Sequence, residues 1–200
     1  MYDKNDSFPI VFGVLLIVFI LLGVTGNIAI VCVFSQGEQR SRVISHLMIN
    51  LAFSNILICV FGYPVATAHL KAAMTDHFHC TWLAFSNATT GIVCILTLSF
   101  MTVTQYRVLA NITVPLNQRN RLNKSRIFLS IAAIWITAIV LSIPPMFGWN
   151  RFVPVQTGFS CHPDWTSQDP ADRAYIWFLV IGGFIIPLTV ICVSYGMMYR

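Results

Sequence analysis

Residues 148–165 read GWNRFVPVQTGFSCHPDW and lie between two long apolar segments. The stretch directly follows Pro144-Pro145-Met146-Phe147, where prolines are expected to end a helix. Turn-forming pairs, Pro163-Asp164 and Asp169-Pro170, mark the region 148–174 as the longest loop of the chain. A long structured loop next to a helical bundle is typical of a lid, so we expect it to cover a cavity.

The composition excludes an ordinary soluble domain. The chain is 56% hydrophobic and only 10% charged, whereas about a quarter of the residues of a soluble domain are charged. Five apolar segments are each long enough to cross a bilayer, and they lack the alternation of barrel strands. The sequence predicts an all-α membrane protein with a single domain over residues 1–200. The expected helices cover about 9–34, 44–68, 82–108, 127–147 and 175–199.

The distribution of charge predicts the orientation in the membrane. With the N-terminus outside, the inner side carries eight basic residues and one acid, and the outer side carries four basic residues and six acids. The basic charges form no stripe interleaved with aromatic residues, which argues against a nucleic-acid partner. Membrane lipid is expected to surround the helices. The inner basic residues are Arg40, Arg42, Arg107, Arg119, Arg121, Lys124, Arg126 and Arg200.

The third span carries a polar stripe at helical spacing. Polar side chains avoid lipid, so this face is expected to turn inward, either toward a ligand or as packing between helices. Gly91 lies beside the stripe and permits the close approach of a ligand or a neighbouring helix. No Asp, Glu, Lys or His lies deep in a span, which argues against a pump or an ion-coupled transporter. The stripe consists of Asn87, Thr90, Cys94, Thr97, Met101 and Gln105.

Other local signals concern isolated residues. Asn50 and Trp135 are expected to approach each other, because a polar group inside the bilayer needs a partner and an indole N–H supplies one. Asn5 begins an N-glycosylation motif on the outer side. His77-Phe78-His79-Cys80 is interpreted as a solvated loop with an oxidised cysteine, so no metal site is expected. No nucleophile motif indicates an enzyme.

The loop resembles the second extracellular loop of the opsins. A Pro-Pro that ends a helix, then Gly-Trp, then Ser-Cys-x-x-Asp-Trp, carries the resemblance, and in that family the loop is a plug over retinal. Cys80 and Cys161 share the oxidising outer side, and the resemblance implies that they form a disulfide. Further landmarks resemble rhodopsin-like (class A) G-protein-coupled receptors in general. They are Gly26-Asn27, Asn50-Leu51-Ala52, Cys80, Trp135 and Pro187 with Tyr195.

The departures from the opsin pattern are equally specific. Asn55 stands where the family has an Asp, and Thr104-Gln105-Tyr106 stands where Glu/Asp-Arg-Tyr would contact a G protein. Leu83 and Val155 occupy positions at which opsins carry the carboxylate that holds a protonated Schiff base. Arg200 ends the fifth segment, and the resemblance puts the retinal-bearing Lys two helices further on. We therefore interpret the chain as five helices of seven, with helices six and seven missing and no Schiff base.

The resemblance implies an opsin-like, light-sensing receptor in the plasma membrane that couples to a heterotrimeric G protein. The expected pocket residues are Asn87, Gly91, Trp165 and Phe184, around a retinal that is not bound covalently. One alternative is a retinal-binding photoisomerase with little signalling, which Gln105 favours. Others are a non-opsin class A receptor for a peptide or another small ligand, and a truncated chain that only forms a dimer with a full-length relative. An amine receptor is disfavoured because its ligand-pairing Asp is Asn87 here.

Overall fold

The computed structural model of the chain describes residues 8–36, 43–62, 77–110, 124–155 and 161–199. Two short π-helical turns, η2 (Ile58–Gly62) and η4 (Ile181–Ile185), and one 3-10 turn, η3 (Pro144–Phe147), interrupt or extend the helices. An antiparallel pair of strands, β1 (Phe152–Pro154) and β2 (Cys161–Pro163), forms a hairpin between the fourth and fifth spans. The helices are α1 (Phe8–Ser35), α2 (Val43–Leu57), α4 (His77–Ala110), α6 (Lys124–Ser142), α7 (Pro170–Val180) and α8 (Ile186–Met198).

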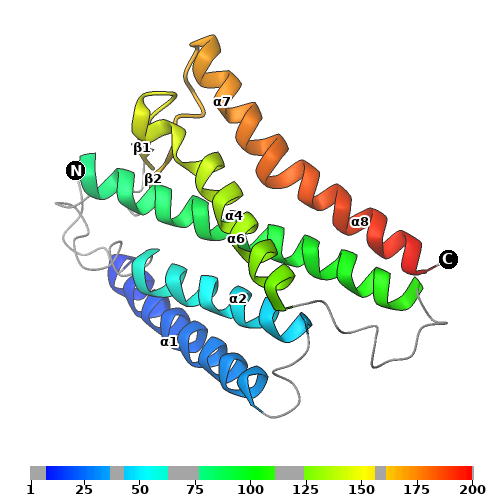
Figure 1. Cartoon of the computed structure of the whole chain (residues 1–200). Coiled ribbons are helices and arrows are strands. Elements are labelled where there is room, and N and C mark those ends of the chain that lie inside the picture. The colour runs from blue at the N-terminus through cyan, green and yellow to red at the C-terminus, as the bar shows by residue number, and fades with distance from the viewer. Residues whose placement is uncertain (1–7, 37–42, 63–76, 111–123, 156–160, 200) are drawn as a thin grey trace.

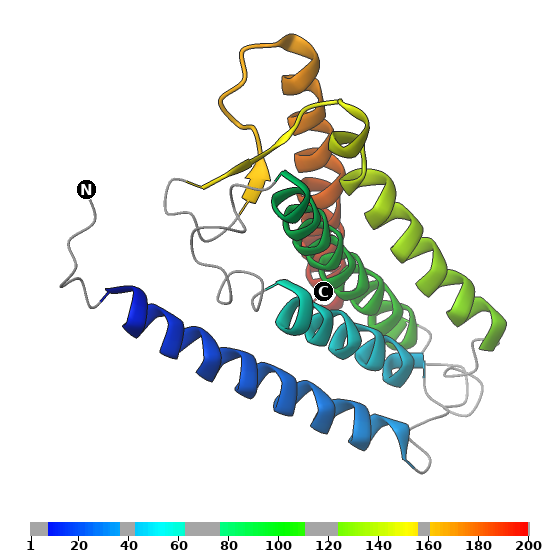
Figure 2. The ribbon, with the colours of Figure 1, turned by 90° about the vertical axis from the view of Figure 1, so that its left-hand side faces the viewer.

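Five helical segments of the described ranges are long and apolar enough to cross a membrane, as the sequence predicts. The last of them combines α7, η4 and α8 into one continuous rod (Figure 1). The long helix α4 runs through the middle of the bundle, with α2, α6 and α8 packed around it, and α1 lies outside α2 (Figure 2). The spans are Gly13–Ser35, Val43–Phe61, Phe78–Ala110, Ser125–Ser142 and Pro170–Met198.

The predicted end of the fourth span at Phe147 is wrong. The α-helix ends at Ser142, and Pro144–Phe147 form a separate 3-10 turn. Proline has no N–H to donate to the preceding turn, and it disfavours the α conformation of the residue before it, so two consecutive prolines stop the helix. The apolar character continues past this point, which is why hydropathy overestimates the helix.

The predicted starts of the third and fifth spans are both too late. Helix α4 begins at His77 rather than at residue 82, because a helix continues beyond the apolar part of its span. The fifth helix begins at Pro170 rather than at residue 175. Asp169 caps it by accepting a hydrogen bond from the Ala171 N–H at 2.9 Å, and Pro170 occupies the first turn. The Asp-Pro pair is thus a helix start and not only a loop turn. Residues 63–68 of the predicted second span lie outside the described residues.

The bundle core is held together by apolar clusters along α4. Ile92 and Val93 pack with residues of α6, among them Ile134 and Ala138, at mid-span. A second cluster joins α2, α4 and the start of α6 through Leu47, Met101 and Ile127.

A polar junction connects the same three helices. The Trp135 indole N–H donates to Asn50 Oδ1 at 3.0 Å, and Asn50 Nδ2 donates to Thr97 Oγ1 at 2.9 Å. The predicted contact between Asn50 and Trp135 is therefore confirmed. Thr97 is fully buried, so the junction lies inside the bundle and not at its lipid face.

Asn55, which stands where the resemblance expects an Asp, takes part in a neutral network between α1, α2 and α4. Its Nδ2 donates to Asn27 Oδ1 at 3.1 Å, and its Oδ1 accepts from the Cys94 thiol at 3.3 Å. The Ser54 hydroxyl of α2 donates to the Thr90 carbonyl of α4 at 3.0 Å. Amide and thiol groups thus satisfy one another here without any charge.

Candidate ligand-binding site

The loop is fastened to the N-terminal end of α4 by a disulfide between Cys80 and Cys161, with 5.5 Å between the two Cα atoms. The pairing implied by the resemblance is confirmed. Phe152 of β1 is 6% exposed and packs in one cluster with Leu83 and Ala84 of α4. The hairpin is therefore held at the helix by both a covalent bond and an apolar contact.

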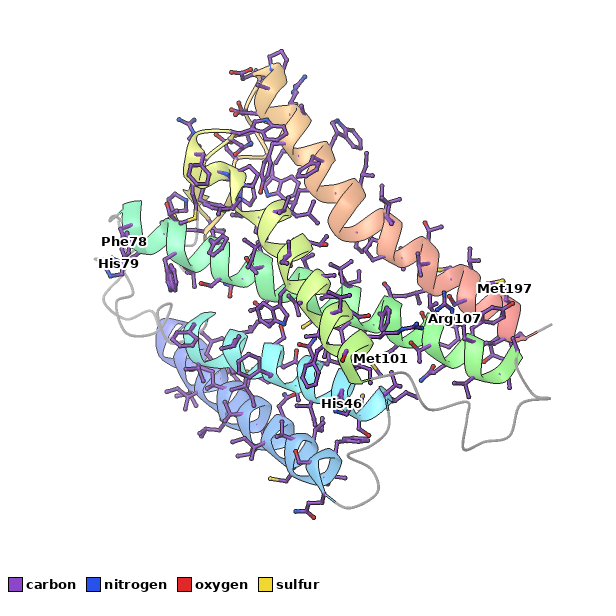
Figure 3. The ribbon with its side chains drawn as sticks, viewed as in Figure 1. His46, Phe78, His79, Met101, Arg107 and Met197 are labelled. Atoms are coloured by element: carbon purple, nitrogen blue, oxygen red, sulfur yellow. A yellow bond between two sulfur atoms is a disulfide. The ribbon has the colours of Figure 1, made fainter. Side chains whose placement is uncertain are left out.

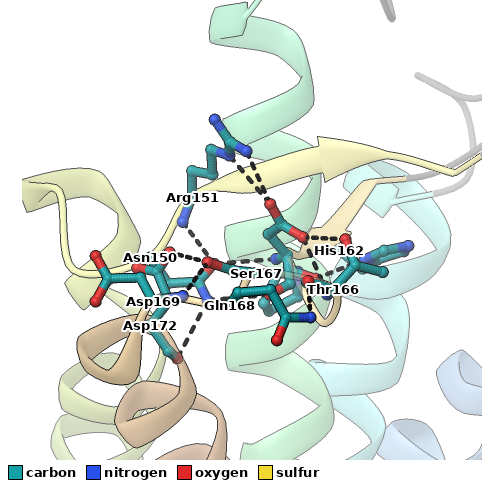
Figure 4. Close-up of polar contacts among 10 residues, drawn as sticks. Asn150, Arg151, His162, Thr166, Ser167, Gln168, Asp169 and Asp172 are labelled. Carbon is teal, nitrogen blue, oxygen red and sulfur yellow. Dashed lines mark hydrogen bonds and ion pairs between the residues drawn. The ribbon is translucent and has the colours of Figure 1, made fainter.

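Asn150 organises the start of the hairpin. It adopts a left-handed backbone with φ of 69°, a conformation that Asn tolerates better than most residues. Its Oδ1 accepts from the Asp164 N–H at 3.0 Å, and its Nδ2 donates to the carbonyls of Asp164 and Asp172 at 3.2 and 3.3 Å. One buried amide thus connects the hairpin to α7 (Figure 4). Sequence analysis did not identify Asn150, because nothing local predicts partners 14 and 22 residues away.

Trp149 is a second residue that joins the loop to α7. Its indole N–H donates to the Ala171 carbonyl at 2.7 Å, and its ring stacks on Phe178 with centroids 5.8 Å apart. Tyr175, which is fully buried, contacts the same ring and donates its hydroxyl to the Leu141 carbonyl. The fourth and fifth spans and the loop are therefore joined at the hairpin end of the bundle.

Asp164 is the charged centre of the loop. Its carboxylate accepts from the Thr166 hydroxyl at 2.8 Å and the Thr166 N–H at 3.1 Å, and it pairs with the Arg151 guanidinium at 3.0 Å. The Thr166 hydroxyl, then Arg151, holds the pKa of Asp164 below its ordinary value. The ionised carboxylate is therefore the form that fits the folded loop.

A lowered pKa makes the loop sensitive to acid. Folding favours the ionised Asp164, so its contribution is complete above the ordinary pKa of 3.8 and is lost as the pH falls through the lower folded value. We expect Asp164→Asn to lower the thermal stability of the loop at about pH 6, and the difference from the unmodified chain should be smaller near pH 2. Scanning both proteins at the two pH values tests this. A difference of equal size at both would contradict it.

Beneath the loop lies a cavity of about 450 Å³, which all four predicted pocket residues line. Asn87 and Gly91 come from α4, Trp165 follows the hairpin, and Phe184 belongs to η4. Trp165 and Phe184 are 51% and 54% exposed, so among the described residues the cavity is an open groove. A Cβ added at Gly91 would meet nothing within 4 Å, so this glycine leaves free space rather than a tight helix contact.

The cavity wall is almost entirely apolar. Of its ten residues, only Asn87 and Trp165 carry polar side-chain atoms. The Asn87 Oδ1 is enclosed and accepts no hydrogen bond from any residue in the described ranges. An enclosed acceptor without a partner is costly, and such groups are frequent where a ligand or water completes a site.

Neither Leu83 nor Val155, the two positions at which opsins carry the Schiff-base carboxylate, lines the cavity. Leu83 is 1% exposed and packs against the hairpin, and Val155 follows β1. Of the three lysines, Lys4 and Lys71 lie outside the described residues, and Lys124 begins α6 at the end remote from the hairpin.

Thr104, Gln105 and Tyr106, which stand where the resemblance expects the G-protein motif, lie near the C-terminal end of α4. Thr104 is buried and donates its hydroxyl to the Phe100 carbonyl within the helix, and Gln105 and Tyr106 are half-buried. The glycosylation motif at Asn5 lies outside the described residues. Within the described ranges, no group of three or more His, Cys, Asp or Glu is placed to hold a metal ion.

Comparison with known proteins agrees with this architecture. Residues 26–200 match the family model "7 transmembrane receptor (rhodopsin family)". The crystal structure of squid rhodopsin superposes with a TM-score of 0.87 at 22% sequence identity, covering 100% of this chain and 54% of that one. The chain belongs to the rhodopsin family of seven-transmembrane receptors. The predicted rhodopsin-like bundle with five spans is thereby confirmed.

Within that family the chain is opsin-like. It is 32% identical over 200 residues to "Rhodopsin, GQ-coupled" of Mizuhopecten yessoensis, covering 98% of this chain and 39% of the relative. It is 30% identical to melanopsin of Rattus norvegicus, covering 99% and 42%, and 33% identical to short-wave-sensitive opsin 1 of Mus musculus, covering 86% and 50%. The chain thus spans between two fifths and one half of these relatives.

Proposed function

We propose that these helices form the retinal-binding part of an opsin-type light-sensing receptor. The observation that carries the proposal is the apolar cavity beneath the disulfide-anchored loop, with Gly91 open toward it and aromatic Trp165 and Phe184 at its edge. A volume of about 450 Å³ lies within the range of small-molecule sites, and an apolar wall with few polar groups suits a conjugated hydrocarbon chain.

The proposed orientation puts the N-terminus outside, in the plasma membrane. The excess of Lys and Arg on the side remote from the hairpin supports it, as does a disulfide on the hairpin side, which requires an oxidising compartment. This orientation puts the hairpin on the extracellular side, where Arg151 of the ion pair is exposed and Asp164 is buried beneath it.

Retinal in this proposal is held without a covalent bond by residues 1–200. A Schiff base needs a lysine amine inside the pocket and a nearby counter-charge. Leu83 and Val155 offer no carboxylate, and none of Lys4, Lys71 and Lys124 belongs to the residues that line the cavity. The bound retinal should therefore absorb close to free retinal.

A retinal-binding photoisomerase with weak signalling is the second candidate. Gln105 supports it, because a neutral amide cannot supply the charge of the arginine that the resemblance expects at this position. Arg107 lies two residues later, about 200° around the helix, and cannot take that place. Coupling to a heterotrimeric G protein is accordingly proposed to be weak.

Retinal titration of the purified chain in lipid nanodiscs tests the proposal. Gly91→Leu should weaken retinal binding about tenfold or more, because the new side chain fills the cavity without a clash at its Cβ. Gly196→Leu is the matched control, since a Cβ there also meets nothing and the residue lies outside the cavity. Borohydride should trap no adduct. Binding that Gly91→Leu leaves unchanged would remove the cavity from the site, and a trapped adduct would refute the non-covalent mode.

A further inference from the structure

A second cavity, of about 360 Å³, lies between α4, α6 and α8 on the opposite side of the bundle from α2. Its wall is formed by Ser99 and Val103 of α4, Ser130, Ala133 and Thr137 of α6, and Val190 of α8, together with further apolar residues. Helices α6 and α7 approach each other at the hairpin end, and α6 and α8 diverge from there toward the other end (Figure 1). We call this cavity the α6–α8 groove.

Two of the three hydroxyl groups of the groove wall, those of Ser99 and Ser130, are already hydrogen-bonded within the protein. The Ser99 hydroxyl donates to the Ile95 carbonyl at 2.8 Å and lies 3.1 Å from the Pro187 carbonyl, and the Ser130 hydroxyl donates to the Arg126 carbonyl at 2.8 Å. The groove therefore presents chiefly hydrocarbon surface to its occupant, with the Thr137 hydroxyl as the remaining polar group of the wall. Its depth in the spans means that the available occupants are lipid chains or another transmembrane helix.

Two arginines lie where the groove approaches the inner end of the bundle. Arg107 is four residues beyond Val103 on α4, and Arg126 is four residues before Ser130 on α6, so each lies one turn from the groove on the same helix face. The two helices are in register there, because Met101 and Ile127 share one buried cluster. Both arginine residues are exposed.

Figure 3 shows Arg107 near the inner end of α4, where the last turns of α8 run alongside. Glu38 is the sole acid that the proposed topology assigns to the inner side. Arg107 and Arg126 are two exposed cations beside an apolar groove, and this arrangement suits a negatively charged headgroup attached to a hydrocarbon chain.

We propose that the α6–α8 groove binds an anionic phospholipid, with an acyl chain in the groove and the phosphate-bearing headgroup at Arg107 and Arg126. Charge complementarity favours this occupant over a zwitterionic lipid, since the cytoplasmic leaflet is the negatively charged one. The site is separate from the retinal cavity and independent of retinal binding.

The test is native mass spectrometry of the chain purified from vesicles of equal parts phosphatidylserine and phosphatidylcholine. The chain should retain phosphatidylserine in preference to phosphatidylcholine. Arg107→Gln combined with Arg126→Gln should reduce that preference about tenfold, because each arginine near the surface contributes attraction to anionic lipid. Arg173→Gln at the opposite end is the charge control and should have no effect.

A second, independent test places a bulky side chain in the α6–α8 groove. Ala133→Phe should reduce retention of both lipids, whereas Ala132→Phe, one residue along on the same exposed helix and outside the groove wall, should not. Equal retention of the two lipids by the unmodified chain would overturn the proposal. It would also be overturned if Ala133→Phe changed only the oligomeric state, because the groove would then be a contact between copies.

Discussion

Replacing Cys80 and Cys161 together by serine is expected to lower the stability of the chain by about 2–4 kcal/mol, the usual effect of losing a native disulfide. The bond closes a separation of 81 residues and attaches the hairpin to α4. Phe152 would still contact Leu83, and Asn150 and Trp149 would still join the loop to α7, but these contacts do not restrict the unfolded chain as the disulfide does. Thermal unfolding of the purified chain, with and without reductant, measures the effect.

Loss of this disulfide should also impair retinal binding, because the bond helps to position the loop that carries Trp165 to the cavity. Cys32→Ser combined with Cys192→Ser is the matched control, since both are free cysteines with exposed side chains. The control should unfold at the temperature of the unmodified chain and should not respond to reductant. An unfolding temperature of the Cys80/Cys161 double variant equal to that of the control would show that the hairpin is held by packing alone.

The second large effect is expected at the polar junction of α2, α4 and α6. Asn50→Leu removes the acceptor of the Trp135 indole N–H and the donor to Thr97 Oγ1. The indole N–H is then left without an acceptor in an apolar interior, so we expect a loss of about 1–3 kcal/mol. The Thr97 hydroxyl keeps its own hydrogen bond to the Val93 carbonyl, so Thr97 adds little to the loss of stability.

A double-mutant cycle separates this contact from general packing. Trp135→Phe together with Asn50→Leu should cost less than the sum of the two single variants, because the shared hydrogen bond is lost only once. Thr25→Val is the control, since the exposed Thr25 hydroxyl bonds only within its own helix. Strict additivity of the two single effects would contradict a direct energetic coupling between Asn50 and Trp135.

The positions of the helix ends show how far local sequence carries the prediction. Hydropathy located all five spans, because about 20 apolar residues in a helix cross the bilayer wherever they occur. It misplaced the end at Ser142 and the start at Pro170, since both ends depend on backbone hydrogen bonds and not on apolar character. The proline pair after Ile143 and the Asp169 cap were readable signals of these ends.

The candidate site was predicted in part for a comparable reason. Asn87 belongs to a polar stripe of one helix, which helical spacing reveals, and Gly91 lies beside that stripe. The family resemblance added Trp165 and the disulfide. Asn150 escaped prediction because its partners Asp164 and Asp172 are distant in the chain, and its side chain joins backbone groups that have no sequence signature.

The sequence by itself determined that five helices cross the membrane, which side is basic, and that Asn50 and Trp135 need polar partners, because each follows from transferring residues out of water into lipid. Only the tertiary structure decided which surfaces remain open. The cavity under the loop and the α6–α8 groove arise from the angles at which α6, α7 and α8 leave α4, and those angles depend on side chains from several helices packing together.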